Sequence, residues 1–458
     1  MDNQQKQHAI LSQSRSLTPA PRDLLKVGSR RWFVQTGLAG VGALSTPDLL
    51  KLQAAGEAVS SGEKKSVILF WLSGGPSQLD MWDPKPDAPQ EVRSPFGTIQ
   101  TSVPGVHFTE HLPLQASIAH KLNILRAVDC SASNHTPITM QAGNPLARRT
   151  NDGKDGGGYP SMGSLVSKFK GPNEPNIPAF IGLAKSWGSD VYGAGLLGQA
   201  HEPVKGLELT DKLGLPEGIQ VDRLRDRQQL QEQFDSFRSR VESEKLYDRL
   251  DQNTQQAFDM VLSGKVSEAF DLSKETDATR DKYGRVSVGE KALLARRLVE
   301  AGSTFVLVSG AWGYFDHHGD DVRWKGIERG LKPLLPRVDR ALFALVNDLE
   351  QRGLLDSTLV LMMGEFGRTP KINEQAGRHH WTPIMSMVMA GGGLPTGQVV
   401  GSSDRNGSEI RTGAVRPQDL AATTFKHLGI DLNTHWMNPA GRPIPIVAEG
   451  GRPIPELV

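Results

Sequence analysis

Alternation between helix-forming and strand-forming segments is the feature of this sequence that most restricts its fold. Between residues 289 and 393 each apolar run with strand character ends in glycine and polar residues, and amphipathic helical patterns separate the runs. Such alternation is typical of an α/β domain, in which a doubly wound, mostly parallel sheet carries helices on both faces. The expected strands are 304–309, 358–363 and 384–390, with 66–72 and 123–128 earlier in the chain, and the expected helices are 290–301, 336–352 and 417–428.

Composition and charge limit the classes of function. The chain has 458 residues and a formal net charge of +1, which argues against binding of nucleic acid or of an anionic membrane. Beyond the N-terminal region no run of about 18 apolar residues occurs, so we expect no stable membrane span after removal of a signal. Cys130 is the one cysteine of the sequence, which excludes an intramolecular disulfide and a thiolate metal cluster. A lone thiol is most often a small buried apolar group, and we expect this role here.

Residues 1–60 have the character of a targeting segment. The pair Arg30-Arg31 follows Ser29, Phe33 comes two places later, and a weakly apolar stretch rich in Gly and Ala covers residues 37–44. This pattern resembles a twin-arginine signal peptide followed by a polar linker. We therefore expect export by the twin-arginine machinery to the periplasm or to the extracellular space. The alternative is a disordered tail that contains an arginine pair by chance.

The rest of the chain, residues 61–458, is expected to form one α/β domain with an insertion. Residues 202–283 are rich in charged, helix-favouring side chains, most of all between 223 and 251. They predict a mainly helical insertion outside the sheet. The stretch 151–158 is rich in Gly, Asp and Lys and predicts a surface loop.

Side chains able to hold a metal ion stand next to the ends of three expected strands. In chain order the polar residues at these ends are Asp316, His318, Glu365, Arg368 and His380. Because parallel strands of a doubly wound sheet end at the same edge, groups far apart in sequence can meet there. Carboxylate oxygens and imidazole nitrogens without sulfur favour zinc or manganese, with calcium or magnesium also possible. The alternative is that His380 stacks on Trp381 and that Glu365 forms a local salt bridge with Arg368.

Four sequence blocks resemble one known family. They are Gly74-Gly75-Pro76-Ser77-Gln78-Leu79-Asp80 with Asp83-Pro84-Lys85-Pro86, Phe315-Asp316-His317-His318-Gly319, Gly364-Glu365-Phe366-Gly367-Arg368-Thr369-Pro370, and Gly377-Arg378-His379-His380-Trp381. These blocks extend over nearly the whole chain after the signal segment, and they resemble the exported bacterial family called domain of unknown function 1501. That family is similar to the alkaline phosphatase and sulfatase superfamily, whose members hold one or two metal ions at the carboxyl edge of the sheet and hydrolyse phosphate or sulfate esters.

The resemblance implies metal ligands. The superfamily's first metal site implies Asp316, His318 and His380 as ligands. Its second site has no full match, since Gly74-Gly75 stands at the end of the first strand and Phe366 follows Glu365. Asp80 or Asp83 is the substitute to consider there, with Glu365 beside the first ion or on a weaker second ion.

The resemblance also implies catalytic groups. Cys130 lacks the Pro-x-Arg context of a sulfatase nucleophile, which leaves Thr136 as the hydroxyl nearest the expected place. A metal ion would lower the pKa of the Thr136 hydroxyl or of a bound water and would polarise the ester. Arg368 is expected to clamp the anion in bidentate fashion.

Two functions from different classes follow from these residues. The resemblance implies an exported metal-dependent hydrolase whose substrate is a small anionic phosphate or sulfate ester, or a sulfated or phosphorylated glycan. The alternative is a non-catalytic relative that binds a metal ion, an anion or a partner, because the second metal site and the nucleophile lack a full match. Metal analysis together with an ester-substrate screen distinguishes the two.

Overall fold

The computed structural model describes residues 63–148, 156–207, 265–310 and 313–458, which all belong to one of the chain's two units, Thr46–Val458. The segment predicted as a twin-arginine signal, most of the loop 151–158 and residues 208–264 of the predicted insertion lie outside the described residues. At the described end of that insertion the chain forms two short helices, α11 (Lys265–Phe270) and α12 (Asp277–Tyr283).

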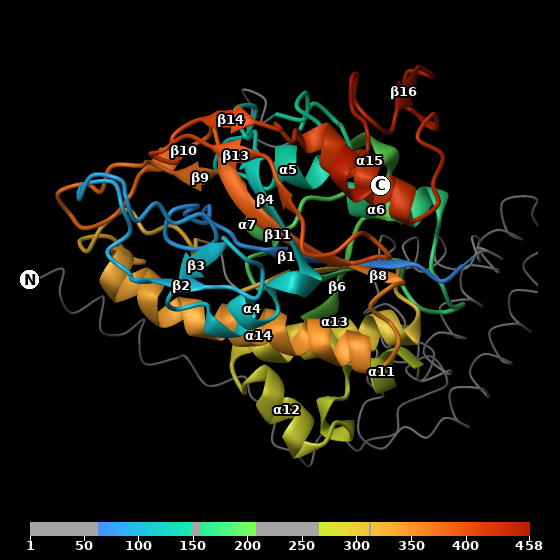
Figure 1. Ribbon diagram of the computed structural model, residues 1–458. Helices are drawn as coiled ribbons and strands as arrows, with labels where there is room; N and C mark the ends of the chain where they lie inside the picture. The colour runs from blue at the N-terminus through green and yellow to red at the C-terminus, as the bar shows by residue number, and fades with distance from the viewer. Residues whose placement is uncertain (1–62, 149–155, 208–264, 311–312) are drawn as a thin grey trace, which may run out of the picture. The chain divides into compact units, whose positions relative to one another are not determined.

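The apolar runs predicted as strands form the centre of an eight-stranded sheet (Figure 1). In spatial order its strands are β12 (Val399–Val400), β4 (Leu122–Val128), β11 (Met385–Gly391), β8 (Thr358–Met363), β1 (Ser66–Trp71), β7 (Phe305–Ser309), β5 (Phe180–Leu183) and β6 (Val204–Lys205). Neighbouring strands pair in parallel, except that β11 runs against both β4 and β8. The prediction of a mostly parallel α/β sheet is therefore confirmed.

Strand β1 lies between β7 and β8, and all six of its residues are buried. Its sequence is continuously apolar after Ser66, as are those of β7 before Ser309 and of β8 after Thr358, rather than alternating between apolar and polar residues. Such runs are expected of parallel strands whose two faces are both covered by other elements. The end of β1 is thus held firmly at the centre of one sheet edge.

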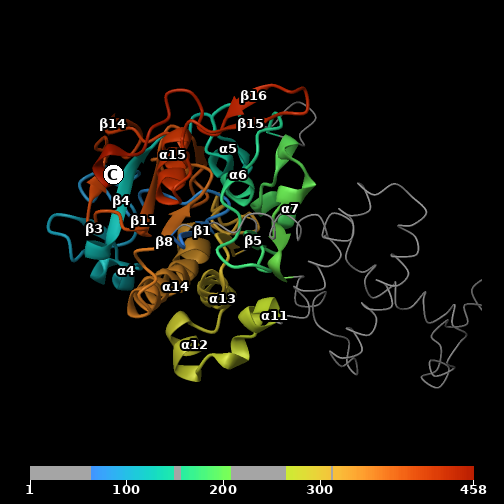
Figure 2. The ribbon, with the colours of Figure 1, turned by 90° about the vertical axis from the view of Figure 1, so that its right-hand side faces the viewer.

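Helices cover both faces of this sheet, as predicted (Figures 1 and 2). On one face lie α4 (Pro113–Ser117), α13 (Ser287–Ala301) and α14 (Lys332–Gln351), with α12 packed on the outside of α13 and α14, and on the other face lie α5 (Ile138–Ala142), α6 (Met162–Phe169) and α15 (Pro417–His427). Helix α13 ends at Gly302, whose φ of 117° suits a glycine. Helix α14 begins before its predicted start at Pro336, because Pro333 occupies a first-turn position where no helical N–H bond is needed.

Short elements occupy the connections. They are the two-stranded pairs β2 (Thr98–Gln100) with β3 (His107–Thr109), β9 (Gly367–Arg368) with β10 (His380–Trp381), β13 (Ser402–Ser403) with β14 (Ile410–Thr412) and β15 (His435–Met437) with β16 (Pro443–Pro445), the helix α7 (Trp187–Asp190), and the helical turns Ala119–Lys121, Gly195–Leu197, Gln199–His201, Leu272–Lys274, Ile327–Leu331 and Pro455–Leu457. The β9–β10 hairpin lies in the chain between β8 and β11, two neighbouring strands of the sheet.

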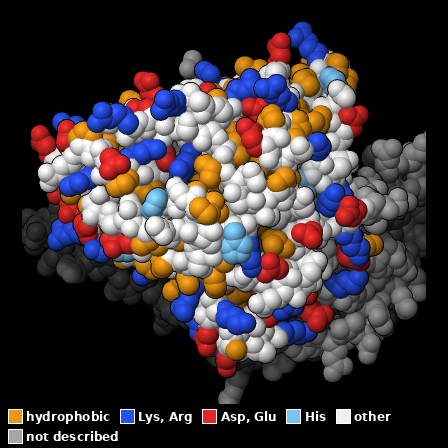
Figure 3. Space-filling model, viewed as in Figure 1, with side chains coloured by type: hydrophobic (Ala, Val, Ile, Leu, Met, Phe, Trp, Pro, Cys, Tyr) orange, Lys and Arg blue, Asp and Glu red, His pale blue; other side chains and the backbone are white. Residues whose placement is uncertain are grey.

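The distribution of charged side chains and the burial of Cys130 follow the expectations from the sequence. Acidic and basic side chains are interspersed over the face shown in Figure 3. Of the helices in the described ranges, none has the length and apolar character needed to cross a membrane. Cys130 is a free thiol and fully buried, and this burial raises its pKa well above the ordinary value.

Candidate metal site

Three segments bring polar side chains to one edge of the sheet. His135 follows β4, Asp316 and His318 lie in the loop after β7, and His380 begins the second strand of the β9–β10 hairpin. His380 comes before β11 in the chain, so it reaches this edge only because β11 runs antiparallel to β8. A parallel β11 would begin at the opposite edge of the sheet.

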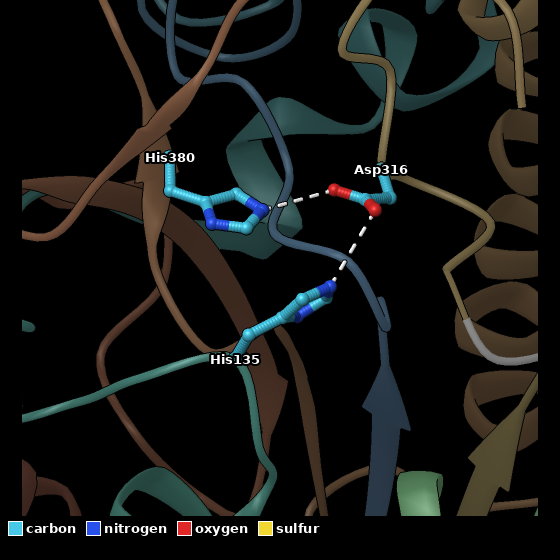
Figure 4. A group of neighbouring side chains, drawn as sticks. All are labelled: His135, Asp316 and His380. Atoms are coloured by element: carbon cyan, nitrogen blue, oxygen red, sulfur yellow. Dashed lines mark hydrogen bonds and ion pairs between the residues drawn. The ribbon is translucent and has the colours of Figure 1, made fainter. Parts of the chain in front are cut away.

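The carboxylate of Asp316 is the meeting point of these side chains. His135 Nε2 lies 3.4 Å from its Oδ2, and His380 Nε2 lies 3.1 Å from its Oδ1. Figure 4 shows both rings directed at the carboxylate. His318 Nε2 is 2.9 Å from the same Oδ1 and 2.8 Å from His380 Nε2. Three imidazoles therefore present their Nε2 atoms around one carboxylate.

The spacing of these atoms is that of a metal-binding group. Among the described residues, His135, Asp316 and His380 each offer a ligand atom, and these atoms lie within 4.8 Å of one another. Donors about 2.05 Å from a tetrahedral zinc ion are separated by roughly 3.3 Å. The separations around Asp316 are close to this value, so the donors can converge on one ion with small side-chain movements.

A further carboxylate orients His135. Glu365, which follows β8, is 2% exposed, and its Oε1 lies 2.9 Å from His135 Nδ1. The backbone N–H of Gly74 donates to the same oxygen at 2.8 Å. A carboxylate on Nδ1 leaves Nε2 as the metal-facing nitrogen, the usual arrangement around a metal-bound histidine. In the structure Glu365 therefore supports a histidine of the group.

Gly74 also allows the close approach of two loops. Its φ is 107°, and a Cβ at this position would stand 2.5 Å from the backbone nitrogen of Asp316. Only glycine combines this backbone conformation with such a contact. The glycine turn at the end of β1 thus brings the Asp316 loop against the centre of the sheet edge.

Arg368 holds Asp316 from the buried side. Its guanidinium is 2% exposed, and Nη2 lies 2.7 Å from Asp316 Oδ1. The remaining hydrogen bonds of this guanidinium go to the backbone carbonyls of Gly74, Gly75 and Arg378. Burial would raise the pKa of Asp316, but hydrogen bonds from the three histidines and the charge of Arg368 hold that pKa well below its usual range. The carboxylate is ionised, as a metal ligand must be.

The histidines differ in their electrostatic surroundings. Burial would lower the pKa of His135, but hydrogen bonds to Asp316 and Glu365 and their negative charges raise it to about 9. Burial lowers the pKa of His380 despite its hydrogen bond to Asp316, which favours the neutral imidazole. The side chains are partly open, with exposed fractions of 26% for His135 and 33% for His380, so a ligand can reach the group from solvent.

The structure brings some of the predicted site residues together and separates others. Asp316, His318 and His380 meet as the resemblance implied, and Glu365 joins them through His135. Asp80 lies elsewhere: it is fully buried, and its carboxylate accepts hydrogen bonds from Arg378 and Ser77. These donors occupy the oxygens that a metal ion would need.

Asp83, the other substitute considered, is likewise engaged. Its buried carboxylate pairs with Lys85 at 2.9 Å and Arg126 at 3.3 Å, and it also accepts from the Ser403 hydroxyl. In the structure, cations and a hydroxyl therefore already occupy this carboxylate.

The two predicted catalytic groups also have other partners. The Thr136 hydroxyl donates to Asn134 Oδ1 at 2.6 Å. Among the described residues, the side chains in contact with Asp316 are those of His135, His318, His380 and Arg368, without Thr136. Arg368 has its donors on Asp316 and on backbone carbonyls, because it is buried beneath the group rather than at its open side. In place of the salt bridge between Glu365 and Arg368 that the alternative required, Glu365 contacts His135 and Arg368 contacts Asp316.

His135 is the member of the group that the sequence analysis did not select. The sequence did contain an indication, since His135 follows a predicted strand and precedes Thr136. The sequence did not reveal the spatial order of the strands. The antiparallel β11 separates β4 from β8, so the carboxyl end of β4 reaches the same edge as that of β8.

The fold and this group define an α/β protein with a histidine and carboxylate cluster at the carboxyl edge of its central sheet. The profile of the family described as "Protein of unknown function (DUF1501)" matches residues 64–458, and the chain belongs to that family. The family suggested by the four sequence blocks is thereby confirmed.

The chain is similar in structure to solved proteins of low sequence identity. A sulfatase from Pseudoalteromonas sp., PsFucS1, is 13% identical with a TM-score of 0.38, over 86% of this chain and 72% of that one. Phosphonate monoester hydrolase SpPMH from Silicibacter pomeroyi is 12% identical with a TM-score of 0.34, over 86% and 76%. Ps i-CgsB in complex with k-i-k-neocarrahexaose is 12% identical with a TM-score of 0.37, over 81% and 73%. No curated protein matches the chain in sequence. The functional proposal therefore rests on the residues of this chain.

Proposed function

We propose that the protein is an exported metal-dependent hydrolase of phosphate or sulfate esters. The observation that carries this proposal is the convergence of His135, Asp316 and His380 at a partly open edge of the sheet. Clefts at the carboxyl ends of parallel strands are the usual ligand sites of such folds. The ester class comes from the motif resemblance, and within it we propose a small anionic ester or a sulfated or phosphorylated glycan as substrate.

The donor set fits a divalent ion. Imidazole nitrogens with one carboxylate suit zinc best, manganese is the next candidate, and magnesium and calcium prefer sites made of oxygen. His135, Asp316 and His380 would hold the ion, with His318 as a further donor beside Asp316. A bound ion of this kind supplies Lewis-acid polarisation of the ester and lowers the pKa of a coordinated water.

The chain's own residues prepare the group for this ion. Glu365 fixes the ring orientation of His135, and Arg368 holds the Asp316 carboxylate in its ionised form. Both side chains are almost fully buried, so their positions do not depend on solvent. Supporting groups of this type commonly change metal affinity or activity by about 10–100-fold when removed.

Metal analysis of the full chain, expressed and exported natively, tests the proposal together with a screen of phosphate and sulfate monoesters and diesters. We expect stoichiometric zinc or manganese and hydrolysis of one ester class. Asp316→Ala and His380→Ala should lose most of the metal and the activity. His435→Ala is the matched control, because His435 is exposed and bonds to a backbone carbonyl in its own turn. Wild-type protein without bound metal, indistinguishable from Asp316→Ala, would refute the metal site.

A second candidate, a metal-binding protein without catalysis, is favoured by one specific observation. The two groups expected to act on substrate, Thr136 and Arg368, have their polar atoms on Asn134 and on Asp316 instead. Stoichiometric metal without hydrolysis of any ester in the screen would select this candidate.

A further inference from the structure

Asp80 and Arg378 form a buried ion pair that the proposed chemistry does not use. Asp80 is 0% exposed and Arg378 is 1% exposed. Arg378 Nε lies 2.8 Å from Asp80 Oδ2, and Nη2 lies 3.1 Å from Oδ1, so the contact is bidentate. Burying two charges costs free energy that only good geometry and further hydrogen bonds offset, so such a pair is weak evidence for stability alone. The further hydrogen bonds of this pair indicate its role.

The guanidinium of Arg378 joins three separate segments. Besides Asp80, it donates to the backbone carbonyl of Val92 at 3.0 Å and to the carbonyls of Thr369 and Pro370. Asp80 comes from the loop after β1, whereas Thr369 and Pro370 follow directly on β9. All the donor nitrogens of Arg378 are therefore engaged, and the loop between β9 and β10 is tied to the segment that follows the central strand.

The backbone of Arg378 connects this pair to the candidate metal site. Its N–H donates to the carbonyl of His317 at 3.1 Å, and its carbonyl accepts from Arg368 Nη1 at 3.1 Å. His317 stands between Asp316 and His318, and Arg368 holds the Asp316 carboxylate. The residue two places before His380 is thus bonded to the loop that carries Asp316.

We propose that Asp80 and Arg378 are a positioning pair for the metal site, a role that rests on the proposed function. The pair fixes the β9–β10 loop against the Asp316 loop, and this sets the separation between His380 Nε2 and Asp316 Oδ1. Asp80 therefore acts on metal binding through Arg378 and is not itself a ligand.

If the pair merely stabilised the fold, its loss would lower the free energy of unfolding and leave the metal affinity of the folded protein unchanged. A matched control exists in α13, where another buried arginine pairs with acidic side chains that are not part of the site. Arg296 in α13 is also 1% exposed and contacts Glu275, Glu300 and Asp348 at 2.9, 2.7 and 2.9 Å. Loss of this second buried arginine should destabilise the fold without touching the site.

The experiment measures the Kd for Zn²⁺ by competition with a chromophoric chelator on metal-free full chain. The variants are Arg378→Gln, Arg378→Lys, Asp80→Asn, the double variant Asp80→Asn/Arg378→Gln, and Arg296→Gln. Each single change at the pair should weaken Zn²⁺ binding by about 10–100-fold, as expected of groups that support metal ligands. The double variant should weaken it by less than the product of the single effects, because the two residues act as a unit. Arg296→Gln should leave the Kd within about twofold.

Several outcomes are decisive. Arg378→Gln and Asp80→Asn with wild-type Zn²⁺ affinity would overturn the positioning role while leaving the proposed metal site intact. A strong loss in Asp80→Asn alone, with Arg378→Gln unaffected, would also overturn it by making Asp80 a ligand. Wild-type chain that binds no Zn²⁺ would instead remove the proposed site itself, and the role of the pair with it. Should Arg378→Gln fail to fold, Arg378→Lys retains the charge without the bidentate contact, and it must still show the weakened Kd.

Discussion

Replacement of Gly74 by alanine is the most direct test of how the site is assembled. The φ of 107° disfavours any side chain at this position, and this strain costs about 1–3 kcal/mol. The new Cβ would also stand 2.5 Å from the nitrogen of Asp316 and 2.8 Å from the carbonyl carbon of Phe315. Both atoms belong to backbone, which cannot rotate away, so forced packing adds about 1–3 kcal/mol.

Gly105 separates these two effects. Its φ is 76°, and nothing lies within 4 Å of a Cβ placed there. Gly105→Ala should therefore show the strain alone, and Gly74→Ala should lower the free energy of unfolding by about 1–3 kcal/mol more. Urea unfolding of the metal-free proteins measures this difference. Because the clash pushes on the Asp316 loop, Gly74→Ala should also weaken Zn²⁺ binding, whereas Gly105→Ala should not. Equal stability and equal Zn²⁺ affinity of the two variants would refute the view that Gly74 sets the approach of this loop.

Three further predictions concern other parts of the chain. Thr136→Ala should keep Zn²⁺ and ester hydrolysis, and loss of hydrolysis alone would reinstate Thr136 as the nucleophile. Changing both Arg30 and Arg31 to Lys should leave the protein in the cytoplasm on cell fractionation, and undiminished export would exclude the twin-arginine route. Burial raises the pKa of Asp339 from 3.8 to about 6 despite hydrogen bonds from the backbone of Leu114 and Gln115. The folded state therefore favours the protonated acid, so this group contributes roughly 3 kcal/mol below pH 4 that is lost as the pH rises through 6. Asp339→Asn should reduce the fall in urea midpoint between pH 4 and pH 7, and an unchanged fall would contradict this assignment.

The strands that matter most for the site could be predicted from the sequence. Strand β8 has the predicted bounds, and β1, β4, β7 and β11 lie within a residue or so of theirs, because continuous apolar runs that end in glycine or polar residues have few other interpretations. Short edge strands such as β6 and β12, with two residues each, escaped prediction because periodicity has no meaning over that length.

The members of the site were harder to predict than the strands. Asp316 and His380 could be predicted from the sequence because each stands close to a segment with a clear strand pattern. His135 was missed, and the pairing of Asp80 with Arg378 was not foreseen, for one physical reason: chain order does not reveal the spatial order of strands or the partner of a buried charge. Asp80 resembles a ligand in sequence, but the arginine that neutralises it lies 298 residues further along the chain.

Because β11 runs antiparallel to β8, some residues of the site are close to one another in sequence, whereas others are far away. Residues 358–391 run through β8, the β9–β10 hairpin and β11, and β8 pairs directly with β11. Glu365, Arg368 and His380 therefore belong to one supersecondary unit that short loop closures can form early. Asp316 and His135 reach this unit only after long-range closure of the sheet around β1. Tight metal binding would accordingly require the completely folded sheet, since no local fragment of the chain contains the whole cluster.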